Sequence, residues 1–457
     1  MLKPTDPAKT NGHGIWSFNL PDEILVTDEY APLSPEDEKT VHAVHQRLIQ
    51  EVDIKAIEKL GPDRGHEAVE MATRALLAEV APSLYGERKE QVIRRIVDDA
   101  VGLGPLQPLV KDESISEIMV NSPEEIYYER DGIIYLSALR FRDRDHVSLV
   151  VDRIIAPLGR RVDESSPFVD ARLPDGSRVN IIIPPLVPRS PTITIRKFRP
   201  DKFNMVDLVA IETITQEVAD FLRACVNLRL NIVVSGGTGT GKTTLLSALS
   251  AYIPERERII TIEDPIELKL QQRHVIACEA RPSNIEGRNE VTQRELLRNA
   301  LRMRPDRIIV GEVRGAEAFD MMQAMNTGHE GSLTTVHANS PRDALSRIEN
   351  MMLMAGFDLP VRAIREQMSS AFHIVIQLSR FADGTRRIVS LSEVVGMEDI
   401  TVTMQELFRF DISSIGIDGR IVGRLVPTGI MPTFGERFAQ AGVALDSIIP
   451  AMGGKWG

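Results

Sequence analysis

The chain has 457 residues, of which 43% are hydrophobic and 26% charged, and its formal net charge is -11. This composition is typical of a globular protein of two or three domains and argues against a disordered chain. The acidic balance disfavours binding of nucleic acid by the whole surface and leaves only a local basic patch for that role. With two cysteines, Cys225 and Cys278, a four-thiolate zinc site within one chain is excluded, and we expect both thiols to be reduced and structural.

No segment of the sequence has the pattern of a membrane anchor. The N-terminal segment MLKPTDPAKTNGHGIW contains no apolar core of a secretory signal. No run approaches the ~20 apolar residues that a membrane helix requires. We therefore expect a cytoplasmic protein, which another protein has to hold if it works at a membrane.

The N-terminal hundred residues predict a tail and then a helical module. Residues 1–33 are mixed polar residues with Pro and Gly, and we expect a flexible tail. Ser34 can cap a helix that continues with Pro and two acidic residues and then places apolar residues on one face. Two more helical patterns, at about 66–80 and 86–101, complete a helical module at 34–104.

Residues 105–199 predict an α+β domain. Short alternating strands surround the Asp-Gly turn signals at 131–132 and 175–176, each of which indicates a hairpin. A helical pattern at 146–159 lies between the two hairpins. We expect residues 200–210 to form a linker, with Pro200 at its start.

The remaining residues, 211–457, predict a second kind of domain. Short runs rich in Ile and Val alternate with helical patterns, which is the signature of a mainly parallel sheet with crossover helices. These runs are NIVVSG (231–236), RIITIED (258–264), DRIIVGEV (306–313) and GSLTTVH (331–337). The sequence therefore predicts an α/β fold for this part, followed by a C-terminal extension.

A glycine-rich loop joins the first of these strands to a helix. Gly236-x-x-x-x-Gly241-Lys242-Thr243 fits the phosphate-binding loop pattern, in which backbone N–H groups and a helix N-terminus surround a phosphate. Lys242 can reach the β- and γ-phosphates, and the Thr243 hydroxyl can bind Mg²⁺. We predict ATP and Mg²⁺ as cofactors. The predicted nucleotide-binding residues of the loop are Gly236, Gly237, Thr238, Gly239, Thr240, Gly241, Lys242, Thr243 and Thr244.

A dinucleotide-binding loop is the competing interpretation. It would use an acidic residue about 20 positions after the glycines, and Glu263 and Asp264 lie near that offset. However, the third glycine of G-x-G-x-x-G is replaced by Thr244, and Lys242 has no role in that scheme. The phosphate-binding loop is the better interpretation.

Phosphate chemistry also requires acidic groups, and two strand ends provide them. A P-loop enzyme usually places an Asp at the end of a later strand, but this chain has Gly311 there, followed by Glu312. A second acidic cluster, which begins with Glu263, ends the preceding strand. Because carboxyl ends of parallel strands line the ligand crevice, we expect both clusters to face the phosphates, with Glu312 orienting or deprotonating the attacking water. Solvated loop acids are the alternative.

Two histidines, His329 and His337, flank the strand GSLTTVH. A lone histidine is usually a surface or core residue with ordinary hydrogen bonds. Two histidines on one strand beside a phosphate site favour contact with the γ-phosphate. Zinc is not expected, because no further ligand cluster accompanies them.

Four motifs, taken together, resemble those of the type II/type IV secretion ATPase superfamily. GGTGTGKTT, TIEDPIE, LRMRPDRIIVGEVRG and NTGHEGSLTTVHANS match, in order, its Walker A motif, Asp box, atypical Walker B motif and His box. The resemblance covers about residues 105–380. The Walker B motif of that family commonly has the Gly-Glu pair. The fold that the resemblance implies is a RecA-like ATPase domain, preceded by a PAS-like α+β domain and a helical module.

The stretches RLPDGSRVNIIIPP and TITIRKF are most similar to those of the Tad-pilus ATPases, the CpaF group. The resemblance implies that Glu312 and Glu263 are catalytic acids and that His337 and His329 are the His-box residues. It also implies that Arg178 and Arg196 contact the phosphates, as arginine fingers do. A surface ion pair is the alternative for each arginine.

The resemblance also implies partners. Members of that family assemble as homo-hexameric rings, bind ATP between the second domain and the P-loop domain, and use hydrolysis to drive an inner-membrane platform protein from the cytoplasmic face. We therefore expect an Mg²⁺-dependent ATPase that powers pilus assembly, retraction or secretion, with peripheral membrane association through partners and no stable nucleic acid. A nucleic-acid-translocating ring ATPase and a nucleotide-binding scaffold without turnover are the alternatives.

Overall fold

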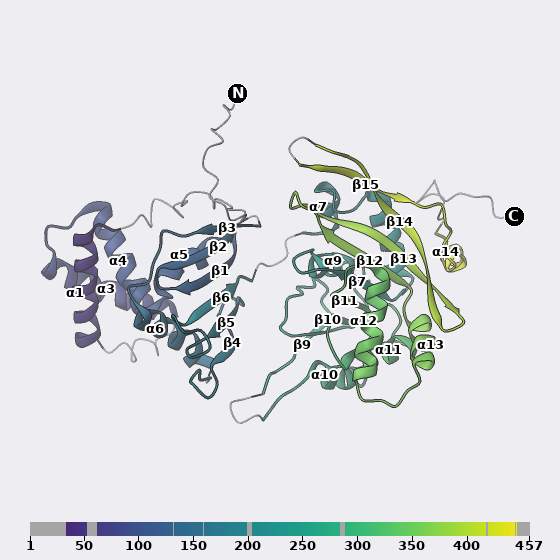
Figure 1. Ribbon diagram of the computed structural model, residues 1–457, viewed down its shortest axis with the longest axis horizontal. Coiled ribbons are helices and arrows are strands. Elements are labelled where there is room, and N and C mark those ends of the chain that lie inside the picture. The colour runs from purple at the N-terminus through teal and green to yellow at the C-terminus, as the bar shows by residue number, and fades with distance from the viewer. Residues whose placement is uncertain are drawn as a thin grey trace, which may run out of the picture. The chain divides into compact units, whose positions relative to one another are not determined.

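The computed structural model of the chain describes residues 33–52, 62–130, 132–158, 160–198, 203–283, 288–416, 419–443 and 445. It consists of two compact units, Met1–Arg199 and Pro200–Gly457 (Figure 1). The tail predicted at residues 1–33 lies almost entirely outside the described residues, and so does Pro200.

The first unit begins with three helices. They are α1 (Pro35–Glu51), α3 (Pro62–Val80) and α4 (Gly86–Val101). The Ser34 hydroxyl accepts a hydrogen bond from the Asp37 N–H at 3.1 Å, which is the N-cap that the sequence predicts. Apolar side chains from all three helices, among them Val44, Leu77 and Ile96, form one buried cluster.

The rest of this unit is built around an antiparallel sheet. Its strand order is β3-β2-β1-β6-β5-β4, and every neighbouring pair is antiparallel. The strands are β1 (Ile115–Ser122), β2 (Glu125–Arg130), β3 (Ile133–Leu136), β4 (Phe168–Arg172), β5 (Arg178–Ile182) and β6 (Thr192–Arg196). The helical segments are η2 (Gly104–Leu106), α5 (Gln107–Lys111), α6 (Arg144–Ile155) and η3 (Ala156–Leu158).

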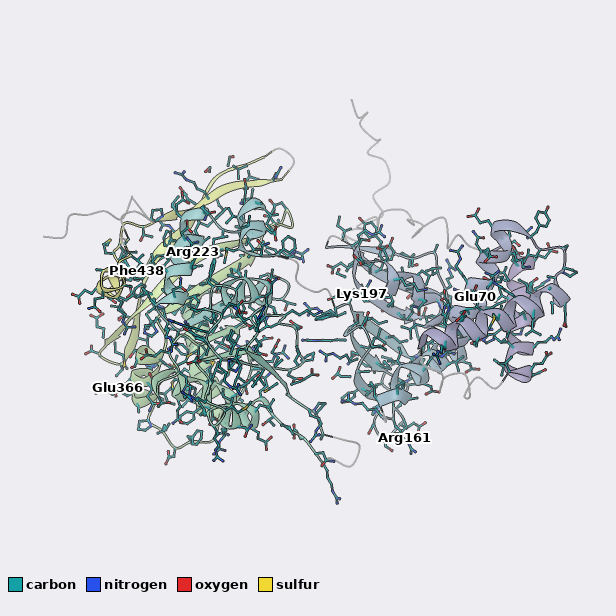
Figure 2. The ribbon with its side chains drawn as sticks, turned by 180° about the vertical axis from the view of Figure 1, so that it is seen from behind. Glu70, Arg161, Lys197, Arg223, Glu366 and Phe438 are labelled. Carbon is teal, nitrogen blue, oxygen red and sulfur yellow. The ribbon has the colours of Figure 1, made fainter. Side chains whose placement is uncertain are left out.

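One face of this sheet packs on α6. Val147, Val150 and Val151 of the helix share a buried cluster with alternate residues of the strands. Near the end of the sheet, the Lys197 ammonium donates to the Asp112 carbonyl at 2.6 Å (Figure 2). The region is therefore an α+β arrangement, and its PAS-like character stays a prediction.

The second unit contains a nine-stranded sheet of order β15-β14-β13-β12-β7-β11-β10-β8-β9. Pairs from β12 to β9 are parallel, and pairs from β15 to β12 are antiparallel. The strands are β7 (Ile232–Gly236), β8 (Ile259–Glu263), β9 (Val275–Glu279), β10 (Arg307–Val313), β11 (Leu333–Val336), β12 (Ile374–Arg380), β13 (Arg386–Glu398), β14 (Thr401–Ile415) and β15 (Ile421–Pro427). The predicted mainly parallel α/β sheet is confirmed, with an antiparallel extension that the sequence analysis did not predict.

Helices cover both faces of the parallel part. They are α7 (Met205–Ala210), α8 (Gln216–Asn227), α9 (Lys242–Ser250), α10 (Gln293–Ala300), α11 (Glu317–Asn326), α12 (Pro341–Met354) and α13 (Val361–Ala371). Ile232 and Val234 of β7 belong to the same buried cluster as α8 and α9, whereas Val233 belongs to the cluster of α10 to α13. This alternation shows that each face of the sheet has its own apolar core.

Two segments differ from the simplest expectation. Residues 205–210, part of the predicted linker, form α7, because the Asn204 side chain and Asp207 make a capping box. The C-terminal extension packs on α8 through α14 (Gly435–Gln440), which carries Phe438 (Figure 2). Phe438 stacks on Phe221 of α8 with ring centroids 5.7 Å apart. The extension therefore contributes to the core of the second unit.

Candidate functional site

The phosphate loop lies at the edge of the sheet where the parallel strands end. Ser235 of β7 pairs with Val336 of β11, and Gly236 pairs with Leu378 of β12. Parallel strands that are in register finish together, so residues that follow them gather at one edge. We call this edge, formed by the C-terminal ends of β12, β7, β11, β10 and β8, the loop edge.

The loop has the backbone that its glycines predict. Gly239 and Gly241 have φ values of +69° and +92°, which side chains other than glycine rarely adopt. The Lys242 ammonium donates to the carbonyl oxygens of Gly236 at 3.0 Å and of Gly237 at 2.8 Å. The ammonium therefore lies over the loop, where it can exchange these carbonyls for phosphate oxygens.

An acidic pair lies beside the start of α9. The Thr243 hydroxyl donates to the Glu267 carboxylate at 3.3 Å. The backbone N–H groups of Glu267 and Leu268 donate to Oε2 of Glu263 at 2.8 and 2.9 Å. Burial raises the pKa of Glu263, and the nearby Glu267 charge adds to the rise. The other oxygen of Glu263 is buried and has no hydrogen-bond partner within the described chain.

A steric contact explains why the Walker B position is a glycine. In the register of β8 with β10, Ile262 pairs with Val310, so Glu263 lies beside Gly311. A Cβ atom at Gly311 would lie 2.9 Å from Cγ of Glu263. The Glu263 side chain therefore occupies the space that the usual Asp would need, and the two acidic positions have to be understood together.

Glu312 has a salt-bridge partner on the same strand end. Its carboxylate accepts from Nη2 of Arg314 at 2.7 Å, and the Arg314 side chain is 56% exposed. This hydrogen bond raises the pKa of Arg314. Glu312 is half-buried and belongs to the loop edge. Because Arg314 is this exposed, breaking its salt bridge with Glu312 costs little free energy.

His337 also belongs to the loop edge. It directly follows Val336, the residue of β11 that pairs with Ser235. Desolvation lowers the pKa of His337, and the positive charge of Lys242 lowers it further, whereas Glu312 acts in the opposite sense. The structure therefore brings together the loop, Glu263, Glu312 and His337.

His329 lies elsewhere. It precedes β11, and Leu333 at the start of that strand pairs with Ile232 at the start of β7. Its place is the opposite edge of the sheet, about one strand length of ~13 Å from the loop edge. Within one chain, His329 therefore lies away from the loop edge, because two residues that flank a strand lie at its opposite ends, and its contact with the nucleotide stays a prediction.

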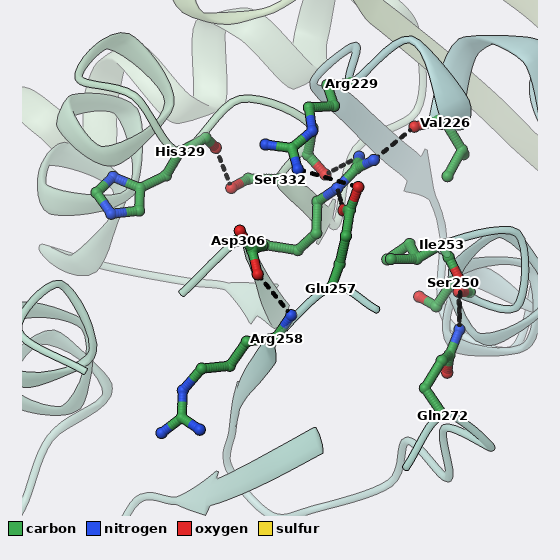
Figure 3. A network of polar contacts seen from close by, with 12 residues as sticks. Val226, Arg229, Ser250, Ile253, Glu257, Arg258, Gln272, Asp306, His329 and Ser332 are labelled. Carbon is green, nitrogen blue, oxygen red and sulfur yellow. Dashed lines mark hydrogen bonds and ion pairs between the residues drawn. The ribbon is translucent and has the colours of Figure 1, made fainter. Parts of the chain in front are cut away.

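The opposite edge contains a buried ionic network (Figure 3). The fully buried Arg307 pairs with Glu257 at 2.5 Å and also donates to the carbonyls of Gly331 and Val226 at 3.1 and 2.9 Å. Arg229 pairs with the same Glu257 at 3.0 Å. These contacts join the starts of β8, β10 and β11 to the end of α8, so the network has a structural role.

The two predicted arginine fingers, both in the first unit, are direct neighbours. Arg178 of β5 pairs with Arg196 of β6, and Arg172 of β4 pairs with Arg178. Arg196 lies 3.7 Å from the Glu117 carboxylate. Like charges in direct cross-strand register are unfavourable unless an anion compensates them. These three arginines therefore form a positively charged row beside Glu117. Arg172 was not among the predicted residues, although the hairpin signal of Asp175-Gly176 could have placed it opposite Arg178.

Sequence reasoning missed three further residues of the loop edge. Glu267 is part of a predicted acidic run, but its contact with Thr243 is visible only in the folded chain. Arg380 and Arg386 flank a turn that contains Asp383-Gly384. That pair is a hairpin signal that could have predicted the turn.

Comparison with known proteins identifies the family of this P-loop protein. The model of the family "Type II/IV secretion system protein" matches residues 99–407. The chain belongs to this family. The resemblance that the four sequence motifs predicted is thereby confirmed at family level.

Individual relatives agree with this assignment. The chain is 36% identical over 312 residues to the type IV secretion system protein PtlH of Bordetella pertussis, covering 62% of this chain and 91% of that protein. It is 30% identical over 311 residues to the conjugal transfer protein TrbB of Rhizobium radiobacter, covering 66% and 90%. Among solved structures, the VirB11 ATPase of Brucella suis is 31% identical over 63% of this chain and 94% of that chain, with a TM-score of 0.35.

Two structural findings concern membranes and metals. In the described part of the chain, no helix combines the length and the apolar character needed to cross a membrane. Among the same residues, no group of three or more His, Cys, Asp or Glu side chains has a geometry that could hold a metal ion.

Proposed function

We propose that the protein is an ATP-hydrolysing motor of a type IV secretion or pilus system, with a Tad-type pilus as its preferred assignment. The observation that carries the proposal is the convergence of Lys242, Thr243, Glu263, Glu312 and His337 at the loop edge. Family membership supports an ATPase, and the names of the relatives support a role in secretion or transfer.

The geometry supports distinct roles for the two acids. Glu263 is buried, and two backbone N–H groups donate to its carboxylate. Because its pKa is raised, Glu263 is suited to accept a proton from the attacking water. Glu312 is half-buried and held by an exposed arginine, so it is suited to orient that water. Lys242 and the loop N–H groups stabilise the charge of the transferring phosphoryl group.

Mg²⁺ fits the residues that are present. The Thr243 hydroxyl is an oxygen donor beside the Glu267 carboxylate, and Mg²⁺ in such sites uses one or two protein oxygens with phosphate and water oxygens. In this proposal, Thr243 would hold the metal ion and Glu267 would orient the hydroxyl. When bound, Mg²⁺ neutralises charge on the phosphate oxygens.

The assembly is part of the proposal. By the resemblance, the chain forms a homo-hexamer that docks on inner-membrane platform proteins from the cytoplasmic face, and Arg178 and Arg196 supply positive charge to the transferring phosphoryl group. Their place in a row of three arginines supports an anion-binding role. Residues 200–210, around α7, are proposed to act as the hinge.

Steady-state hydrolysis of Mg-ATP by the purified full chain tests the proposal. We expect Lys242→Ala and Glu312→Gln each to reduce kcat by about 10²–10³-fold, because each removes a group that acts on the transition state. Arg258→Ala, at the opposite edge, is the matched control and should retain activity. Normal turnover by Glu312→Gln would contradict the mechanism.

The cellular role needs its own readout. A deletion strain should lose surface pili or secretion, and the Lys242→Ala chain should fail to restore them. A deletion strain with normal pili and normal secretion would contradict the motor assignment. Salt-sensitive stimulation of hydrolysis by DNA or RNA would instead support a nucleic-acid-translocating ATPase.

A further inference from the structure

The turn between β12 and β13 lies beside the phosphate loop and presents two arginines to it. A Cβ atom built on Gly239 would lie 3.9 Å from Nη1 of Arg380, and one built on Gly241 would lie 3.7 Å from Cδ of Arg386. Both glycines have positive φ values and form the tip of the loop. Two residues more than 130 positions further along the chain therefore contact the loop where phosphate binds.

The two arginines have different tasks. Nε of Arg386 donates to the Gly239 carbonyl at 2.7 Å, so this side chain holds the loop backbone. Arg380 is exposed, and within the described part of the chain its guanidinium makes no hydrogen bond or ion pair. Its donors are therefore available to an incoming ligand at the tip of the loop.

The turn that carries Arg380 is held in place. The Asp383 carboxylate accepts from the Thr385 N–H at 2.9 Å and from the Ile421 N–H of β15 at 2.9 Å. The Phe381 ring lies 5.4 Å from that of Phe410 on β14. The base of the arginine is thus fixed by neighbouring strands, which limits the entropy that the side chain loses when it binds a ligand.

The position of β12 in the sheet indicates which part of the nucleotide Arg380 can contact. Glu263 lies at the end of β8, Glu312 near the end of β10, and His337 directly after β11. These three strands lie on one side of β7 in the sheet, whereas β12 lies on the other side. The reacting γ-phosphate has to lie on the side of the acids. A side chain on the β12 side of β7 therefore lies near the α-phosphate, the point at which the nucleoside extends out of the loop.

We propose that Arg380 is a nucleotide-binding residue that contacts the α-phosphate of ATP and ADP, with Arg386 and Asp383 as positioning residues. This inference rests on the proposed function. A planar guanidinium matches two phosphate oxygens, and such charge-assisted pairs are among the strong hydrogen bonds of proteins. The contact would contribute equally to the binding of ATP and ADP, and the acids would carry out the chemical step.

The test measures binding and turnover of Arg380→Ala in the full chain. We expect about a tenfold weaker Kd for ADP and a similar rise in the KM for ATP, with kcat nearly unchanged, because the contact is the same before and during reaction. Competitive inhibition by pyrophosphate, which has no α-phosphate linked to a nucleoside, should keep its inhibition constant. Arg380→Lys should recover part of the ADP affinity, because it restores charge without the planar fork.

Arg424→Ala is the matched control. Arg424 is an exposed arginine on β15, three strands from β12 in the same sheet, and its removal should leave both constants unchanged. An Arg380→Ala chain with unchanged ADP affinity and KM would overturn the inference, and equal weakening of pyrophosphate would overturn its assignment to the α-phosphate. A wild-type chain that neither binds ADP nor hydrolyses ATP would overturn the proposed function itself.

Discussion

The two edges of the parallel sheet contain similar residues and use them differently. At the opposite edge, Arg307 and Arg229 both pair with Glu257, and Arg307 also donates to carbonyl groups inside the protein. At the loop edge, among the described residues, one buried oxygen of Glu263 has no hydrogen-bond partner, and Glu312 pairs with an exposed arginine. Internally paired charges hold strands together, whereas incompletely paired ones are available for a ligand.

The comparison teaches that residue type alone does not locate a site in a parallel sheet. Successive strands point in the same direction, so a residue before a strand and a residue after it lie at different edges. His337 and His329 illustrate this, since they flank one short strand and have different surroundings. The four predictions below test whether the edges are as distinct as their contacts indicate.

The largest expected effect is on stability, at the opposite edge. Arg307→Ala leaves the buried Glu257 with Arg229 as its remaining partner, so we expect the free energy of unfolding of this unit to fall by about 3 kcal/mol. Urea denaturation followed by circular dichroism measures the change. Well below the unfolding transition, the KM for ATP should be unchanged. A large rise in KM with intact stability would contradict the division between the edges.

The next effect is on catalysis, at the loop edge. Glu263→Gln keeps the shape of the side chain and removes its ability to accept a proton. We expect kcat to fall about 100-fold, or about 2.7 kcal/mol, while the unfolding free energy is kept or rises because a buried charge is lost. Single-turnover hydrolysis checks the first expectation and urea denaturation the second. Full activity of this variant would assign proton transfer to another group.

A smaller effect is expected at Gly311, which lies beside Glu263. Gly311→Ala places a Cβ atom 2.9 Å from Cγ of Glu263 and should displace that carboxylate by a few tenths of an ångström. We expect kcat to fall about tenfold with nearly normal ADP binding. Isothermal titration with ADP separates the two quantities. Gly315→Ala, a neighbouring glycine whose Cβ would meet only the Glu317 carboxylate at 3.3 Å, provides the comparison.

The smallest effect is a displacement of the acid limb of activity. Burial raises the pKa of Glu263, so its ionised form is lost at a higher pH than that of an ordinary glutamate, and kcat should fall from that pH downward. Stability follows the opposite sign: a raised folded-state pKa contributes stability below the unfolded value, and this is lost as pH rises through the folded value. In Glu263→Gln, this pH dependence of stability should disappear. An acid limb at the usual glutamate value would contradict the burial argument.

Local patterns predicted much of this molecule. The Ser34 cap, the strand–loop–helix backbone of the glycine-rich loop and the parallel strands of the second unit are confirmed, since capping, positive φ at glycine and apolar periodicity act over short distances. The antiparallel extension from β13 to β15 was not predicted. Its strands follow β12 in chain order and are joined by short turns, and the Asp383-Gly384 pair between β12 and β13 is a hairpin signal from which the first of these pairs could have been predicted.

By itself, the sequence determined the family, and it predicted the nucleotide loop and the pair of acids at Glu263 and Glu312, because each belongs to a short motif. Only the tertiary structure decided how these parts meet. It showed that Glu263 fills the space at Gly311, separated His329 from His337, and brought Arg380 to the loop. The physical reason is the register of parallel strands: it sets which strand ends are neighbours, and it depends on packing across the whole sheet.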